Sequence, residues 1–306
     1  MNNVIEVEHL KKTYGSLNAV DDVSFHVEEG EIFGLLGPNG AGKTTSIECI
    51  QALRHPFTGD VSVLGLDPRK DARELRKYIG SQLQDSALPS RIKVWEALDL
   101  FASFTPNALD WELLLKQLGL AEKRNSSFGG LSGGQKQRLF IALALVNDPK
   151  IVFLDEMTQG LDPVARRVAW DLVKAIRDKG KTVVMVTNFM DEAENLCDRL
   201  AIVKKGRIVA TDSPQGLINS YATQIKVLFS TDEADISYLE QITSVNSVNR
   251  YGSHVEILGI GPVLPLVAAA LVEHGITPAD LRIDQPTLED VFLILTSDVE
   301  PAKVNQ

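Results

Sequence analysis

The sequence predicts an α/β domain that carries an all-helical insert and is followed by a small α+β domain. Short apolar runs without polar alternation predict strands that are buried on both faces, as in parallel sheets. Helical patterns separate these runs, and this alternation is typical of an α/β arrangement. After Ser213-Pro214-Gln215-Gly216 the pattern changes to shorter strands and helices. The apolar runs are residues 31–36, 150–154 and 182–186.

The first domain is expected to span residues 1–220. Residues 31–36 run directly into a glycine-rich turn, and residues 44–53 then read as a helix. A further helix is expected at 164–177, between two of the apolar runs. Residues of about 90–147 show helical patterns and no strand pattern, which predicts a helical subdomain within the α/β core. Its helices are expected at 94–104, 111–118 and 135–146.

Residues 221–297 are expected to form a small accessory domain. Their order is strand, helix, strand, strand, helix, strand, the β-α-β-β-α-β pattern of ferredoxin-like domains. A last helix is expected at 287–295, and residues 298–306 are expected to form a flexible tail. The strands are expected at 225–229, 244–250, 255–258 and 278–283, with helices at 233–241 and 263–274.

Composition argues against one class of partner. The 306-residue chain has a formal net charge of −10 at pH 7 and no run of lysine or arginine. Because a nucleic-acid partner normally requires a basic face, no nucleic-acid partner is expected. The two cysteines, Cys49 and Cys197, lie far apart without metal-ligand spacing. They are expected to be reduced thiols in a cytoplasmic protein.

The chain shows neither a secretion signal nor a membrane span. Its start, Met1-Asn2-Asn3-Val4-Ile5-Glu6, lacks the basic residues and apolar core of a signal peptide. No apolar run approaches the roughly 18 residues that a membrane helix needs. The most apolar stretch, residues 263–272, is short and contains Pro265. If the protein works at a membrane, another chain must supply the membrane spans.

A glycine-rich motif follows the first predicted strand. Gly37-Pro38-Asn39-Gly40-Ala41-Gly42-Lys43-Thr44 fits the pattern G-x-x-x-x-G-K-[ST] between a strand and a helix. Its glycines let the backbone wrap closely and aim N–H groups at phosphate oxygens. Lys43 can reach the β- and γ-phosphates of ATP, and the Thr44 hydroxyl can bind Mg²⁺. The predicted ATP-binding residues here are Gly37, Pro38, Asn39, Gly40, Ala41, Gly42, Lys43, Thr44 and Thr45.

Two acidic residues end the second predicted strand, in Ile151-Val152-Phe153-Leu154-Asp155-Glu156. Two acids at a strand end are more often solvated loop residues. Beside a phosphate-binding loop they indicate metal and acid–base chemistry instead. Asp155 is expected to hold Mg²⁺, and Glu156 is expected to orient or deprotonate the attacking water.

A third motif opens a helix in the insert. Leu131-Ser132-Gly133-Gly134-Gln135 follows Phe128-Gly129-Gly130, and a Ser-Gly-Gly turn at a helix start can bind an anion as well as cap the helix. With this motif, residues of about 4–220 resemble the nucleotide-binding subunit of an ATP-binding cassette (ABC) transporter. Five motifs occur in the order that this family shows.

The resemblance implies a shared ATP site. In the family, the phosphate loop of one subunit and the Leu-Ser-Gly-Gly-Gln signature of another enclose the same ATP. The partner is then a second copy of the chain in a head-to-tail dimer, or a homologous subunit. This assigns Ser132, Gly133, Gly134 and Gln135 to the nucleotide of the partner. Asp162, in Gly160-Leu161-Asp162, matches the loop that couples the two sites.

The resemblance also assigns two side chains at the edge of the site. Tyr14, in Lys12-Thr13-Tyr14-Gly15, matches the aromatic residue that stacks on adenine, and an aromatic face suits a purine. Gln84 matches the glutamine that reaches Mg²⁺ and senses the membrane partner, with Gln82 as a weaker candidate. Residues 85–91 are expected to dock onto an integral membrane permease.

The sequence departs from the family at two positions. The family usually has a histidine that contacts the γ-phosphate, after the strand that ends near Val186; here the residue is Asn188. Asparagine can donate a hydrogen bond, but its amide is shorter and carries no charge. Asparagine at this position is compatible with slowed hydrolysis or with a site that mainly binds ATP. Asn188 can be the natural residue or one introduced to trap ATP. Met157 stands where proline is common.

The C-terminal residues indicate a subfamily. Pro286-Thr287-Leu288-Glu289-Asp290-Val291-Phe292 is similar to the end of ATPase subunits in drug and polysaccharide exporters of the daunorubicin-exporter kind. Those subunits often carry a small extra domain. The resemblance implies an ATP-hydrolysing subunit that powers a separate permease, and that lies on the inner face of the cell membrane through this partner.

Two other functions stay open at this point. One is a soluble ABC ATPase that acts on ribosomes or DNA. The single phosphate loop, the single signature, the absence of a heptad array and the acidic balance argue against it. The other is a weakly hydrolysing, nucleotide-dependent regulatory module, which Asn188 permits.

Overall fold

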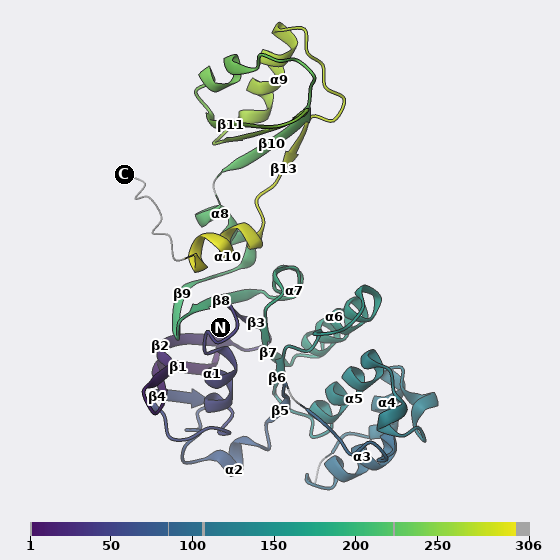
Figure 1. Cartoon of the computed structure of the whole chain (residues 1–306). Helices are drawn as coiled ribbons and strands as arrows, with labels where there is room; N and C mark the ends of the chain where they lie inside the picture. Colours follow the sequence, from purple (N-terminus) through teal and green to yellow (C-terminus); the bar gives the residue numbers. More distant parts are fainter. Residues whose placement is uncertain (1, 85, 106–107, 223, 298–306) are drawn as a thin grey trace. The chain divides into compact units, whose positions relative to one another are not determined.

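The computed structural model describes residues 2–84, 86–105, 108–222 and 224–297 (Figure 1). The chain divides into two compact units, Met1–Pro214 and Gln215–Gln306. The division therefore falls directly after the first residue of helix α8 (Pro214–Tyr221), which the sequence pattern placed in the first domain. The expected tail at 298–306 and the first residue of the expected docking loop, Asp85, lie outside the described residues.

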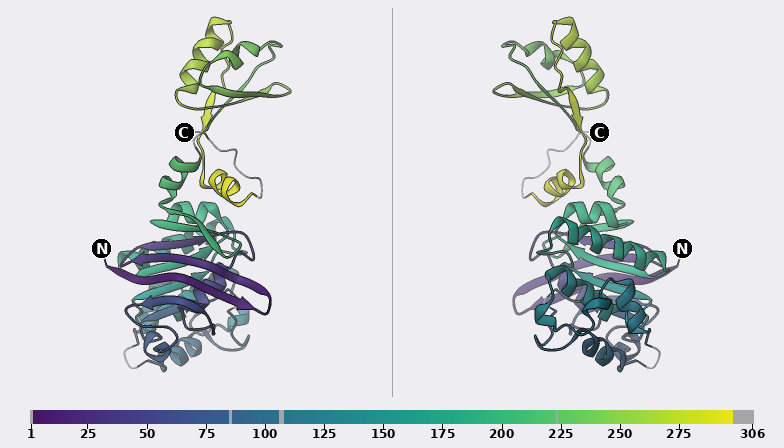
Figure 2. Two further views of the ribbon diagram at one scale, coloured as in Figure 1. Left: turned by 90° about the vertical axis from the view of Figure 1, so that its left-hand side faces the viewer. Right: turned by 90° about the vertical axis from the view of Figure 1, so that its right-hand side faces the viewer.

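The first unit is built on a nine-stranded sheet with the order β4-β1-β2-β9-β8-β3-β7-β6-β5. Strands β8, β3, β7, β6 and β5 run parallel to one another. Strand β8 pairs antiparallel with β9, and β1 pairs antiparallel with β2 and with β4. Figure 2 shows β1 and β2 as long purple strands lying side by side. The strands are β1 (Asn3–Tyr14), β2 (Leu17–Glu28), β3 (Ile32–Leu36), β4 (Thr58–Val63), β5 (Ile79–Gln82), β6 (Ile151–Asp155), β7 (Thr182–Thr187), β8 (Arg199–Lys204) and β9 (Arg207–Asp212).

The predicted central strands are confirmed. Every residue of β3, β6 and β7 is buried, as their continuous apolar runs predict. Their register aligns the carboxyl ends: Leu36 lies opposite Thr187, and Asp155 lies opposite Val186. The segments that follow these three strands therefore emerge at the same edge of the sheet.

Helices cover this sheet and form the insert. The all-helical insert is confirmed, and in Figure 1 its helices gather beyond β5 and β6. An isolated β-bridge joins Lys93 and Ser127 at its base. The helices of the first unit are α1 (Lys43–Ile50), α2 (Ala72–Leu75), α3 (Val94–Ala102), α4 (Trp111–Gln117), α5 (Gly133–Leu145), α6 (Pro163–Asp178) and α7 (Met190–Leu196), with 3₁₀ turns at Ala121–Lys123 and Phe128–Gly130.

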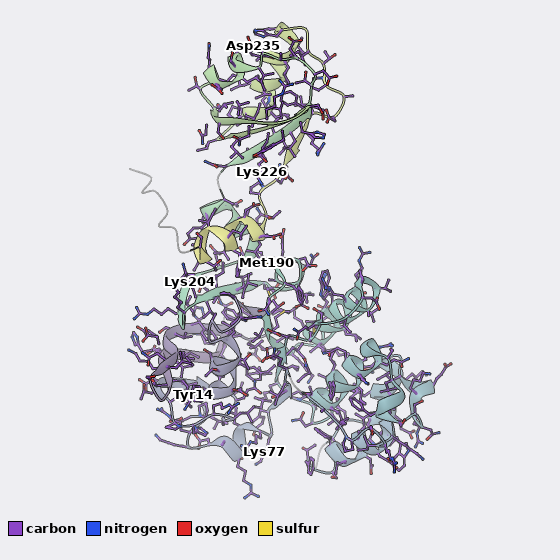
Figure 3. All side chains as sticks on the ribbon, in the orientation of Figure 1. Tyr14, Lys77, Met190, Lys204, Lys226 and Asp235 are labelled. Carbon is purple, nitrogen blue, oxygen red and sulfur yellow. The ribbon has the colours of Figure 1, made fainter. Side chains whose placement is uncertain are left out.

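The second unit has its own antiparallel sheet, with the order β11-β12-β10-β13. Apolar residues of β10 and β12 pack beneath α9 in a separate core that includes Phe229 and Leu271. Figure 3 labels Lys226 on β10 and Asp235 in the segment that follows it. The elements are β10 (Ile225–Ser230), η3 (Ser237–Gln241), β11 (Val245–Tyr251), β12 (His254–Gly259), α9 (Val263–Glu273), β13 (Arg282–Asp284) and α10 (Leu288–Thr296).

One predicted helix of this unit differs. Residues 233–241 were expected to be an α-helix, but only Ser237–Gln241 is helical, and it is a 3₁₀ turn. Asp235 Oδ1 accepts hydrogen bonds from the backbone N and the hydroxyl of Ser237, at 3.0 and 2.7 Å. Such local side-chain bonds compete with helix formation, so they delay the start of this helix.

Candidate functional site

The glycine-rich loop joins β3 to α1 at the edge where the parallel strands end. Gly40 and Gly42 have φ of 77° and 101°, and Gly42 is the N-cap of α1. A Cβ atom on Gly37 would lie 2.4 Å from the carbonyl oxygen of Val203 on β8. Only glycine fits there, because the loop backbone packs directly on the neighbouring strand. The loop thus presents backbone N–H groups and the positive end of a helix to an anion.

Lys43 is buried beneath this loop. Its side chain is only 5% exposed, and Nζ donates hydrogen bonds to the carbonyl oxygens of Gly37 and Pro38 at 2.7 and 3.1 Å. Burial lowers the pKa of Lys43, and the negative charges of Glu156 and Asp155 oppose this shift. The site therefore keeps an ammonium group directly under a turn of backbone amides.

Asp155 ends β6 and faces the start of α1. It is 4% exposed, and burial raises the pKa of its carboxyl to about 6, although the Thr44 hydroxyl hydrogen-bonds to it and lowers the pKa. Among the described residues, Oδ1 of Asp155 has no hydrogen-bond partner. A buried carboxylate oxygen without a partner, next to a hydroxyl, fits the oxygen ligands that Mg²⁺ prefers.

Glu156 is held by amide groups from two other segments. Its φ of 46° is unusual for a non-glycine residue, and its backbone N donates to the Val186 carbonyl oxygen at 2.9 Å. Gln84 Nε2 donates to Oε2 at 2.6 Å, and Asn188 Nδ2 donates to Oε1 at 2.7 Å. Asn188 Nδ2 also donates to Asn39 Oδ1 at 2.8 Å. The segments after β5, β6 and β7 thus meet at one carboxylate, and the segment after β3 is linked to it through Asn188.

Lys43, Gln84 and Glu156 border a pocket of about 590 Å³, whereas Asp155 and Asn188 lie behind its lining. Tyr14 lies at its edge, 42% exposed, with Lys12 Nζ 4.6 Å from the centre of its ring. Gln82 is buried and donates to the Asp155 carbonyl oxygen, so Gln84 and not Gln82 reaches the pocket. The lining residues are Tyr14, Leu17, Asn18, Ala19, Asn39, Gly40, Ala41, Gly42, Lys43, Thr44, Thr45, Gln84, Glu156, Gln159 and Lys205.

Several of these lining residues lie outside the predicted set. Residues 17–19 open β2 directly after Tyr14, so the position of Tyr14 in a short hairpin could have pointed to them. Lys205, in the turn between β8 and β9, and Gln159, shortly after Glu156, carry no motif. Their place in the pocket follows from the strand order alone.

The signature residues lie at a different pocket of the same unit. Ser132 is the N-cap of α5; its Oγ accepts from the backbone N of Gln135, and Gln135 Oε1 accepts from the backbone N of Ser132. Asp162 is the N-cap of α6 and accepts from Val164 N and Ala165 N, both at 2.9 Å. Ser132 and Asp162 line a pocket of about 340 Å³, which shares no lining residue with the first in the described part of the chain.

A wide groove runs between the sheet edge and the helical insert. Its volume is about 930 Å³, and it combines four cationic side chains with three aromatic rings. Phe104 is 73% exposed and Phe101 is 36% exposed. Figure 3 shows Lys77 extending outward from the first unit. The charged and aromatic lining residues are Arg73, Arg76, Lys77, Lys150, Tyr78, Phe101 and Phe104, together with Asp148.

No helix in the described ranges is long and apolar enough to cross a membrane. The same ranges contain no cluster of three or more His, Cys, Asp or Glu side chains that could hold a metal ion by themselves. A metal at Asp155 would therefore need further ligands, which a hydroxyl and phosphate oxygens can supply.

Comparisons with known proteins agree with this fold. Residues 20–159 match the family described as "ABC transporter". The Nod factor export ATP-binding protein I of Burkholderia lata is 36% identical over 304 residues, covering 95% of this chain and 96% of that protein. The protein of the same name from Rhizobium etli is 37% identical over 301 residues, covering 95% and 93%.

Solved structures show the same core. An ATP-binding subunit of an ABC transporter superposes with a TM-score of 0.65 at 28% identity, covering 72% of this chain and 93% of that one. A dimeric ATP-binding cassette with bound ADP and Pi superposes with a TM-score of 0.62 at 30% identity, covering 68% and 98%. The fold and the site are those of a nucleotide-binding ATPase. The chain belongs to the ATP-binding subunits of ABC transporters, and its curated relatives are named as export ATP-binding proteins.

Proposed function

We propose that the chain binds Mg-ATP in the pocket beside Tyr14 and hydrolyses it together with a second subunit, to drive a separate exporter permease. The observation that best supports this proposal is that the phosphate loop, Lys43, Asp155 and Glu156 lie together at one edge of the sheet. Hydrogen bonds from two side-chain amides hold the Glu156 carboxylate there. Residues 37–45 hold the phosphates, Tyr14 stacks on adenine, and Mg²⁺ is bound by Thr44 and Asp155 with Gln84 nearby.

Hydrolysis follows from these positions. Mg²⁺ neutralises the phosphate oxygens and supplies Lewis-acid polarisation when it is bound. Glu156 orients a water and accepts its proton as the water oxygen bonds to the γ-phosphorus. The bond from that phosphorus to the bridging oxygen breaks, and ADP and inorganic phosphate leave. Lys43 and the loop amides stabilise the charge that develops, while Asn188 holds Glu156 in place.

A second subunit completes the site. Within one chain Ser132 and Asp162 lie at another pocket than Lys43, so the signature cannot cover the ATP of its own phosphate loop. Two copies arranged head to tail would place each signature over the nucleotide of the other, and a homologous subunit could do the same. The dimeric ADP-bound and Pi-bound structure of a relative supports this arrangement.

The proposed membrane partner is a permease on the inner face of the cell membrane. The export names of the relatives support this direction of transport. The groove with Arg73, Arg76 and Lys150 and the exposed Phe104 suits a short helix of the permease that carries acidic and apolar residues.

The expected docking loop contacts the segment that leads into the signature residues. Its described part, residues 86–91, bonds to the 3₁₀ turn that precedes Leu131. Gly129 N donates to the Ser90 carbonyl oxygen, and Phe128 N donates to the Ile92 carbonyl oxygen, both at 2.8 Å. A displacement of this loop by the permease would therefore move the segment that leads into Ser132.

The test of this function uses a trapped dimer. Glu156→Gln should bind Mg-ATP without turnover, and light scattering should show a dimer with ATP and a monomer without it. Gly134→Arg in the same background is the matched control. It places a bulky charge in the second pocket, where even a Cβ would lie 3.2 Å from Ala165 Cβ, so ATP should bind without pairing. A monomeric Glu156→Gln at saturating ATP would contradict the shared site.

A second candidate function is a module that scarcely hydrolyses ATP, and Asn188 is the residue that favours it. Phosphate release after addition of the co-purified permease separates the two candidates. Stimulated release supports the transport ATPase, whereas unchanged low release supports the regulatory module.

A further inference from the structure

A buried carboxyl group lies behind the site, on α7. Glu192 is in the first turn of this helix and is 0% exposed. Burial raises the pKa of Glu192, and the nearby charge of Asp191 raises it further. Burying such a group is unfavourable unless it makes hydrogen bonds, so its partners indicate why it is retained.

The partners of Glu192 come from three separate segments. Trp170 Nε1 on α6 donates to Glu192 Oε1 at 3.2 Å. The hydroxyls of Thr187 and Thr158 lie near the carboxyl and, like Trp170, lower its pKa. Among the described residues, Glu192 Oε2 and Thr158 Oγ1 nevertheless have no hydrogen-bond partner. Thr187 and Thr158 are themselves fully buried. Thr187 directly precedes Asn188, and Thr158 follows two residues after Glu156.

Phe189, which follows Asn188 in the sequence, also contacts α6. Arg166 on α6 lies over the ring of Phe189, with 4.7 Å between its guanidinium carbon and the ring centre. Its NH1 also lies 3.2 Å from Asp191 Oδ2. Residues on both sides of Asn188 are therefore attached to α6, whose N-cap, Asp162, lies at the signature pocket.

We propose that Glu192 is a positioning residue for hydrolysis, which fixes the Asn188 segment and the Glu156 segment relative to each other and to α6. The inference rests on the proposed function. Glu192 touches neither nucleotide nor water in this role; it acts through Thr187 and Thr158. A displacement of Glu156 by a fraction of an ångström slows attack on phosphorus without weakening the grip of the loop on ATP.

The test compares turnover with binding in the full-length protein. Glu192→Ala should lower kcat about tenfold or more, while the Kd for Mg-ATP stays within about twofold because the phosphate loop is unchanged. Glu192→Gln keeps the size of the side chain and can accept from Trp170 through its amide oxygen, so it should restore kcat to within about threefold of the wild type. Trp170→Phe, which loses only the N–H, should lie between the two.

Glu31→Gln is the control for the loss of a buried carboxyl. Glu31 is 8% exposed and pairs with Arg199 at 3.1 Å at the start of β3, away from the pocket. Glu31→Gln should have a lower thermal unfolding temperature than the wild type, as Glu192→Ala should. Glu31→Gln should nevertheless keep the wild-type kcat.

Three results would overturn the assignment: wild-type kcat in Glu192→Ala, a Kd that weakens in step with kcat, or a loss that Glu192→Gln does not restore. A wild-type protein that neither binds nor hydrolyses ATP would instead contradict the proposed function itself.

Discussion

The side-chain amide of Asn188 donates a hydrogen bond to Glu156 Oε1 at 2.7 Å, in the place where a charged or ring donor is common in the family. The same amide nitrogen donates to Asn39 Oδ1 at 2.8 Å, so Asn188 ties the proposed base to the phosphate loop. An amide can hold the carboxylate in this way, but it supplies no positive charge to a γ-phosphate. We therefore expect Asn188 to position the carboxylate but to contribute little to stabilisation of the transition state.

Asn188→His should accordingly hydrolyse ATP faster than the wild type. A charge-assisted hydrogen bond contributes roughly 1 kcal/mol more than a neutral one, which corresponds to about a fivefold higher kcat. Steady-state phosphate release from the two proteins measures this difference. Equal rates would show that the position has no special role, and Asn188→Ala should be slower than both because Glu156 then loses its brace.

Asp155 should make the nucleotide-free protein less stable at neutral pH. Its pKa is raised from the ordinary value of 3.8 to about 6, so the folded state binds the proton more tightly than the unfolded state does. The stability contribution of this group is highest below about pH 4, falls as pH rises to about 6, and is constant above that. Asp155→Asn should remove this loss and raise the free energy of unfolding at pH 8 by about 1–3 kcal/mol.

Chemical unfolding between pH 4 and 8 tests this effect, with Asp171→Asn as the control. Asp171 is an exposed carboxyl on α6, and its substitution should change the unfolding free energy by less than about 0.5 kcal/mol. If Asp155→Asn were no more stable than the wild type at pH 8, burial of this carboxyl would not be unfavourable. The same variant should bind Mg-ATP more weakly.

Gly37→Ala should weaken ATP binding through the backbone alone. The added Cβ would lie 2.4 Å from the Val203 carbonyl oxygen, so the loop must move away from β8. We expect Kd for Mg-ATP to rise about tenfold or more, since N–H groups directed at phosphates lose their alignment. Gly130→Ala is the control: its Cβ would lie 3.5 Å from Ser127 Oγ, an ordinary contact, and its Kd should be unchanged. Unaltered binding in Gly37→Ala would contradict the close packing of the loop.

The parts of the fold that could be predicted are those with a local signal. Continuous apolar runs predicted β3, β6 and β7, and glycine spacing placed the phosphate loop between β3 and α1. Strands β1 and β2 lie outside the predicted elements, although their burial alternates along part of their length. The 3₁₀ turn that begins at Ser237 depends on bonds made by Asp235, which apolar periodicity does not reveal.

The site itself could be predicted only as separate pieces. Nothing in the spacing of Asn39, Gln84 and Asn188 shows that their side chains meet around Glu156, because that depends on the strand order β3-β7-β6-β5. Glu192 stands in a polar stretch and is nevertheless fully buried, since α7 packs on β7 and α6. Contacts between segments that are distant in sequence determine whether such a residue is buried. The residues next to it in the sequence do not reveal these contacts.

The proposed activity depends on the contacts that Lys43 and the loop amides make with a triphosphate. Equilibrium titration of Mg-ATP into the wild type and Lys43→Ala tests it most directly, with circular dichroism to show that both proteins are folded. The wild type should bind with micromolar affinity or better, and Lys43→Ala should lose at least about tenfold, the loss expected for one charge-assisted hydrogen bond. Equal affinity in the two proteins, or no uptake by the wild type, would contradict the account.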